Sequence, residues 1–242
     1  MPMSCVINAG RRHVMIPGWG IEITSPSAAA VAIQWYLSGG IAAANCIAAY
    51  TPKGAASLAA SYDNNAAPGN GLADGTYDAA PGVAPTWNAT NGWIFNGSTQ
   101  NLNTGVVPQS DQDQTMIAKF TNWVGDGILA SSITAWDKQL QLSPGRLGVL
   151  WFGNGRVATT AGAFASGTIA VAGSEGYKNG AAVGVSIVGW GGGATQPVWI
   201  GCDNNAGTLA LYGQFYCQAF AIYDTTLTAP QVAAVSAAMA AL

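Results

Sequence analysis

The chain has 242 residues, of which 50% are hydrophobic and only 8% are charged, and its formal net charge is −3. High hydrophobicity with few charges excludes intrinsic disorder, and without a basic stripe nucleic-acid binding has no electrostatic basis. The 32 glycines and 11 prolines indicate frequent turns. Surfaces with little charge repel each other weakly, so self-association is a further expectation.

Residues 1–45 form a segment whose pattern differs from the rest. Its cationic cluster, Arg11, Arg12 and His13, is either a solvated turn or an arm that docks on an acidic partner. The start of the chain lacks the order of a signal peptide, and polar and glycine residues interrupt the apolar run over 28–50. We therefore expect an N-terminal extension or docking arm, and no membrane span.

Short apolar runs separated by turns follow, at spacings of about ten residues that are typical of a β-sandwich. A polar stretch, 61–91, is too long for an idle loop, and we expect it to be ordered over the sheets. Residues 92–102 predict a hairpin, because Asn96-Gly97 is a favourable two-residue turn. The further expected strands cover 47–50, 115–120, 127–132, 140–142, 147–152, 167–172, 183–188 and 197–201.

The last 28 residues predict a strand followed by a helix. The apolar stretch 215–223 is the strand, and Thr228 with Gln231 three residues later matches a capping box. Pro230 falls in the first turn, where its missing N–H costs little. One apolar stripe then recurs at helical spacing: Val232, Val235, Met239 and Leu242.

Four of these patterns together resemble the laminin-G-like, concanavalin-A-like family: Phe95-Asn96-Gly97, Tyr177-Lys178-Asn179-Gly180, Trp199-Ile200-Gly201 and Ile222-Tyr223-Asp224, the last continued by Leu227-Thr228. The resemblance covers residues 46–242. It implies an all-β fold with two antiparallel sheets packed as a jelly-roll sandwich, a short C-terminal helix and residues 1–45 as the extension.

The resemblance also implies carbohydrate binding, in which sugars stack on aromatic rings and polar groups take the hydroxyls. Three tryptophans in turn-like contexts, Trp123, Trp136 and Trp190, are each either a stacking surface or a core residue. Asn204 and Asn205 form a polar turn after an expected strand. A calcium site is common in such domains, with Asp126 and Asp203 as its candidate ligands; we expect no other cofactor.

The residues give little support to catalysis. Glycoside hydrolysis needs paired carboxylates, but the two glutamates, Glu22 and Glu175, are far apart. The single histidine, His13, lies in the extension, which leaves little material for a nucleophilic triad or a zinc site. Cys202 and Cys217 fall on strands expected to be neighbours, so a disulfide and two buried thiols are alternatives.

These observations favour a non-enzymatic structural or adhesion module, because charge is sparse, a signal peptide is missing and the N-terminal segment is unmatched. Modules of this family occur on phage capsids and tail fibres, so the main expectation is capsid decoration or a tail fibre on a virion surface. Its partners would be other virion or surface proteins and further copies. The alternative is a lectin-like domain of a secreted or cell-surface protein that binds glycans; a glycoside hydrolase is a third, weaker reading.

Overall fold

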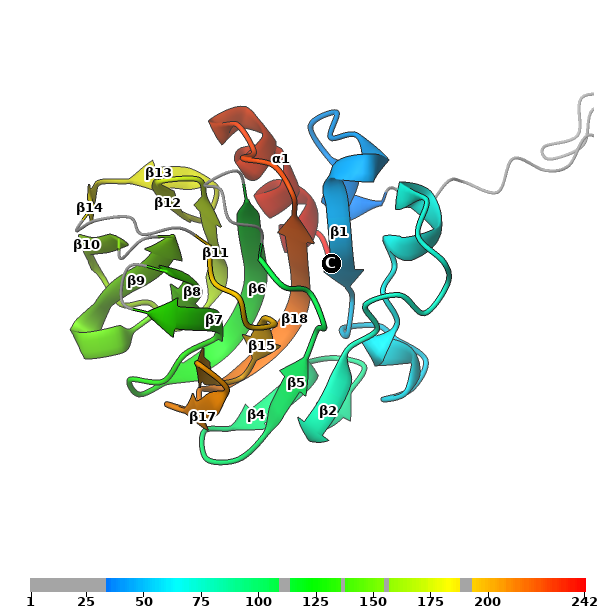
Figure 1. The fold of residues 1–242 in the computed structure, drawn as a ribbon, viewed down its shortest axis with the longest axis horizontal. Helices are drawn as coiled ribbons and strands as arrows, with labels where there is room; N and C mark the ends of the chain where they lie inside the picture. The colour runs from blue at the N-terminus through cyan, green and yellow to red at the C-terminus, as the bar shows by residue number, and fades with distance from the viewer. Residues whose placement is uncertain (1–33, 109–113, 136–137, 155–156, 188–192) are drawn as a thin grey trace, which may run out of the picture. The chain divides into compact units, whose positions relative to one another are not determined.

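The computed structural model describes residues 34–108, 114–135, 138–154, 157–187 and 193–242, and Trp35–Leu242 form one compact unit. Two β-sheets make up most of this unit (Figure 1). The all-β sandwich with a short C-terminal helix is confirmed. Among the described residues, no helix has the length and apolarity that crossing a membrane requires.

The first sheet has the strand order β13-β12-β11-β6-β18-β4-β3, and β1 also pairs with β18. All of its pairings are antiparallel. Its strands are β1 (Cys46–Tyr50), β3 (Thr86–Asn88), β4 (Gly92–Asn96), β6 (Thr115–Val124), β11 (Gly167–Ala172), β12 (Glu175–Lys178), β13 (Ala181–Val183) and β18 (Gln214–Tyr223).

The second sheet has the order β14-β10-β9-β8-β7-β15-β5-β2, and a hairpin of β16 and β17 joins it at β7. The pairing of β16 with β7 is parallel. Its strands are β2 (Ala80–Val83), β5 (Asn101–Asn103), β7 (Ala130–Ala135), β8 (Lys138–Ser143), β9 (Val149–Asn154), β10 (Val157–Gly162), β14 (Val185–Ile187), β15 (Trp199–Ile200), β16 (Asp203–Asn205) and β17 (Thr208–Ala210).

The core between the sheets follows from the alternation of apolar side chains along the strands. Met116, Ala118 and Phe120 of β6 face Leu140 and Leu142 of β8 across the sandwich, and all five are buried in one cluster. Aromatic rings fill much of this space, as in the stacked pair Phe95 and Phe215 with centroids 4.8 Å apart. The second sheet therefore turns its other side chains outward.

The outer face of the first sheet is covered by helix α1 (Ala229–Ala240) and by the segment that starts with η1 (Trp35–Leu37) (Figure 1). The predicted capping box holds, since Gln231 Oε1 accepts the Thr228 backbone N–H at 2.9 Å. Tyr223 Oη donates to the Tyr36 carbonyl at 2.9 Å. Residues 35–45, predicted to belong to the extension, thus pack with the sandwich; Arg11, Arg12 and His13 lie outside the described residues.

The predicted hairpin over residues 92–102 is wrong. β4 belongs to the first sheet and β5 to the second, so the turn between them is a crossover from one sheet to the other. The Asn96 side chain closes this turn locally, because its Oδ1 accepts the backbone N–H groups of Ser98 at 3.0 Å and Thr99 at 3.1 Å. An Asx turn of this kind does not determine whether the flanking strands pair, so the Asn96-Gly97 sequence alone did not predict a hairpin correctly.

The turn at Asn179-Gly180 does join two paired strands. Both residues have positive φ, 52° and 78°, as a two-residue hairpin turn requires. Lys178 of β12 lies opposite Ala181 of β13. The predicted strand 167–172 is confirmed as β11, whereas β2, β3, β10, β16 and β17 were not predicted.

The two cysteines considered for a disulfide are free thiols. Cys217 lies in β18 of the first sheet, whereas Cys202 follows β15 in the second, so the expected strand neighbourhood is wrong. Both side chains are fully buried. Burial raises the pKa of Cys202 to about 12, and the negative charge of Asp203 adds to this, so the thiol stays protonated at neutral pH.

The polar stretch 61–91 is ordered by a buried asparagine. Asn64 Oδ1 accepts the backbone N–H of Ala49 at 2.9 Å and of Ala66 at 3.1 Å. Its Nδ2 donates to the carbonyls of Ile47 at 3.0 Å and Thr76 at 2.9 Å. One side chain thus ties this stretch, which overlaps η3 (Ala60–Tyr62) and contains η4 (Ala67–Asn70), to strand β1.

We expect Asn64→Ala to lower the free energy of unfolding by about 2–4 kcal/mol, because it leaves several buried backbone groups without partners. Asn205→Ala is the matched control: this side chain is exposed, and the change should stay within about 0.5 kcal/mol. Urea denaturation measures both. Equal stabilities of the two variants would contradict the role given to Asn64.

Candidate functional site

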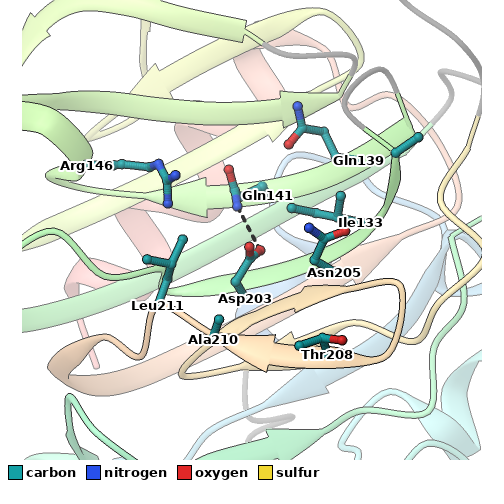
Figure 2. A pocket seen from close by; sticks show the side chains of 10 residues that line it. Ile133, Gln139, Gln141, Arg146, Asp203, Asn205, Thr208, Ala210 and Leu211 are labelled. Carbon is teal, nitrogen blue, oxygen red and sulfur yellow. Dashed lines mark hydrogen bonds between the residues drawn. The ribbon is translucent and has the colours of Figure 1, made fainter.

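A pocket with a volume of about 670 Å³ lies on the outer face of the second sheet (Figure 2). Strands β7 and β8, the β16–β17 hairpin with the residue after it, and the turn η5 (Arg146–Gly148) supply its walls. Its described lining is polar in the middle and aliphatic at the sides: Ile133, Ala135, Gln139, Gln141, Arg146, Asp203, Asn205, Thr208, Ala210 and Leu211.

The floor of the pocket comes from the alternation of β7 and β8. Leu140 and Leu142 point into the core. Gln139, which precedes them, and Gln141, which lies between them, therefore point outward. Gln141 lies opposite Ser131, and Gln139 lies opposite Ile133. Residues that are directly opposite in an antiparallel pair share a face, so these four side chains form the outer surface here.

The β16–β17 hairpin forms one wall of the pocket. Ala206 and Gly207 have positive φ, 49° and 87°, and make the tight turn between its strands. Asn205 lies opposite Ile133, and the Ala206 N–H donates to the Ile133 carbonyl at 2.8 Å. This anchoring points Asp203 toward the outward side chains of β8 (Figure 2).

Asp203 is the buried carboxylate of the pocket, with 6% of its surface exposed. Its Oδ1 accepts hydrogen bonds from Ser131 Oγ at 2.8 Å and Gln141 Nε2 at 3.1 Å. Burial raises the pKa of Asp203, while the Ser131 bond, the Arg146 charge and the Gln141 bond act in the opposite direction. Both of these hydrogen bonds end on Oδ1.

The arrangement suits a ligand with both hydroxyl and C–H surface. Carboxylate, carboxamide, hydroxyl and guanidinium groups supply acceptors and donors, and their fixed positions reduce the ordering cost of binding. Leu211, with 43% of its surface exposed, and Ile133 add aliphatic contacts. Asp203 is the single carboxylate among the described lining residues.

The structure brings two of the predicted site residues together, since Asp203 and Asn205 both line the pocket. Asn204, predicted to bind glycan, is 1% exposed and does not line it. Its Nδ2 donates to the Pro197 carbonyl at 2.8 Å, and its Oδ1 accepts the Gly207 N–H at 3.1 Å. Alternation along β16 explains this correction, because Asn204 points opposite to its two neighbours.

Trp123, for which a stacking surface and a core position were alternatives, is a core residue with 8% of its surface exposed. Its ring packs against Phe120 and Phe215, with centroids 6.2 and 5.5 Å away. Its Nε1 donates to the Gly125 carbonyl at 3.0 Å. The ring therefore has no face for a sugar. Trp136 and Trp190 lie outside the described residues.

The predicted calcium ligands belong to different hydrogen-bond networks. Asp126 Oδ1 accepts the backbone N–H of Leu147 at 3.1 Å, whereas Asp203 binds Ser131 and Gln141. Within the described ranges, no group of three or more His, Cys, Asp or Glu residues is placed to hold a metal ion. The calcium site stays a prediction.

Sequence reasoning missed four polar residues of the pocket: Gln139, Gln141, Arg146 and Thr208. A signal for two of them was present, because Gln139-Leu140-Gln141-Leu142 alternates and so predicts polar side chains on one face of a strand. Arg146 and Thr208 had no such signal, since only the folded chain brings their turns to β8.

No family model matches the chain, and no curated protein matches it. Among solved structures, it is similar to domain 4 of AbnA, an extracellular GH43 arabinanase from Geobacillus stearothermophilus, in complex with arabinotriose. That match has a TM-score of 0.51 and 14% identity, and it covers 79% of this chain and 98% of that domain. The likeness shows a shared fold, an all-β sandwich.

Two further likenesses are weaker. The CBM40 of Ruminococcus gnavus IT-sialidase, bound to α2,3-sialyllactose, matches with a TM-score of 0.41 and 15% identity, over 53% of this chain and 83% of that one. NanB sialidase from Streptococcus pneumoniae matches with a TM-score of 0.42 and 11% identity, over 58% of this chain. The matched part is 26% of that sialidase.

The raised pKa of Asp203 predicts a pH-dependent stability difference. Because the folded state binds this proton more tightly than the unfolded state, Asp203 contributes most to stability at low pH, and that contribution is lost as pH rises through its folded pKa. The free energy of unfolding of the wild type, minus that of Asp203→Asn, should therefore fall between pH 4 and pH 7. Urea denaturation across this range measures it; a difference that rises with pH would contradict the assignment.

Proposed function

We propose that this domain binds carbohydrate in the pocket formed by β7, β8, Arg146 and the β16–β17 hairpin. The observation that carries the proposal is the buried carboxylate of Asp203, held through Oδ1 by Ser131 and Gln141 beside a pocket of about 670 Å³. A fixed acceptor among amide and guanidinium donors suits sugar hydroxyls.

The ligand we propose is a neutral saccharide. The carboxylate of Asp203 and the guanidinium of Arg146 attract each other, which lowers the net charge of the pocket. The aliphatic side chains of Ile133 and Leu211 suit the C–H face of a sugar ring. The similar arabinanase domain was solved with a neutral trisaccharide, arabinotriose, and this supports arabino-oligosaccharides as first test ligands.

We propose binding without hydrolysis. A glycosidase works with two carboxyl groups on either side of the bond that it cleaves, and Asp203 is the single carboxylate among the described lining residues. A location on a virion or extracellular surface, with other surface proteins or further copies as partners, stays a prediction from the sequence. A sugar-binding domain serves adhesion in either setting.

A glycan array followed by isothermal titration calorimetry tests the proposal. We expect Asp203→Asn and Gln141→Ala each to weaken saccharide binding by at least about tenfold, because each removes a fixed polar partner. Asp74→Asn is the matched control, since it makes the same change of charge at an exposed position outside the pocket.

Thermal unfolding of each variant separates lost binding from lost folding. Silence of the wild type across a broad array would overturn the proposal, and so would binding that both pocket variants retain.

A further inference from the structure

Trp199 differs from the other tryptophans in what its ring nitrogen contacts. Among the tryptophans whose side chains the structure describes, Trp35, Trp87, Trp93 and Trp123 each donate from Nε1 to a protein oxygen 2.7–3.0 Å away. Trp199 donates no such bond within the described residues, and its Nε1 is not among their buried atoms without a partner. Its N–H therefore reaches solvent.

Trp199 lies on the same outer face as the pocket. It is opposite Ser131 of β7 and opposite Asn103 of β5, and Ser131 is in turn opposite Gln141. Its neighbour Ile200 is buried in the core, so Trp199 points outward. Ser131, covered by Asp203, separates the indole from the pocket.

The indole extends away from the pocket, across β5 toward β2. A Cβ placed on Gly82 of β2 would lie 3.0 Å from Trp199 Cζ3, although β5 separates β2 from β15. The side chain is partly exposed. Because Trp199 points outward from the sheet, the exposed part of its side chain lies on this outer face.

A polar donor accompanies the ring. Asn103 Oδ1 accepts the Gly105 N–H at 2.8 Å, which fixes the orientation of the carboxamide. In the part of the chain that the structure describes, Asn103 Nδ2 has no protein acceptor. An aromatic face beside an oriented amide and an indole N–H is a combination that suits a sugar ring with hydroxyls at its edge.

We propose that Trp199 is a stacking platform for a second saccharide unit, on the far side of Ser131 from the pocket. This inference rests on the proposed function of the pocket. Two strand spacings of about 4.8 Å separate the backbone of β8 from that of β15, and the indole extends further from the pocket, so the two contact points lie at least about 10 Å apart. The domain therefore recognises oligosaccharides and binds them more tightly than monosaccharides.

Calorimetry with monomer-to-hexamer series of arabino-, xylo- and cello-oligosaccharides tests the proposal. We expect the wild type to gain affinity with ligand length, and Trp199→Ala to remove that gain, a loss of roughly tenfold for the longer ligands. Monomer binding should not change. Trp199→Phe should keep most of the gain, and Trp87→Ala, a partly buried tryptophan of the first sheet, should keep all of it.

Gly82→Ala provides a second variant, which keeps a tryptophan at position 199 but crowds its ring. The added methyl group would collide with the Asn101 side chain, which must move, and would lie 3.0 Å from Trp199 Cζ3, so the indole is displaced by a few tenths of an ångström. We expect a smaller loss of the same selective kind, for long ligands only, without loss of monomer binding.

The outcomes separate the two proposals. If the wild type binds no saccharide of any length, both proposals fail. If the wild type binds and Trp199→Ala has unchanged affinity at every length, the second contact point is overturned while the pocket stands. A loss that is equal for monomer and hexamer would also overturn it, because it would indicate a general structural effect.

Discussion

Residues 217–223 of strand β18 are buried on both faces, and other parts of the described chain cover them. Phe215, Cys217, Phe220 and Ile222 point into the core between the sheets, whereas Ala219, Ala221 and Tyr223 point toward α1 and η1. A register shift between Cys217 and Ala219 changes which alternate residues face the core. Because both faces of this strand carry apolar side chains, each face is covered: one by the second sheet, the other by α1 and η1.

Helix α1 lies against the first sheet, and the candidate site lies on the outer face of the second. The hairpin of β16 and β17 stands against β7, so a surface of outward side chains becomes a pocket with a wall. Ser131 is central to this surface: its hydroxyl binds Asp203, and its position in the register lies between Gln141 and Trp199. The pocket and the indole are thus parts of one face.

The physical character of this face distinguishes it from the core. Its polar groups are held by other polar groups before any ligand arrives, as Gln141 and Ser131 hold Asp203. In a site of this kind, ligand binding costs little free energy for ordering side chains. The folded protein instead bears the desolvation free energy of the Asp203 carboxylate, because a carboxylate that is 6% exposed is poorly hydrated. The raised pKa of Asp203 reflects this.

The sequence by itself determined the strand rhythm, the all-β class, the capped helix after Thr228 and the turn at Asn179-Gly180, because each depends on local alternation or local backbone preference. It also named Asp203 as a calcium ligand and Asn205 as a glycan contact, and both residues line the pocket, although in neither case is the predicted role tested. Only the tertiary structure decided that Asn96-Gly97 crosses between sheets, that Trp123 is core, and that Arg146 and Gln141 meet Asp203. These outcomes depend on which strands pair across long stretches of sequence, and hydrophobic patterns and turn residues do not encode that choice locally.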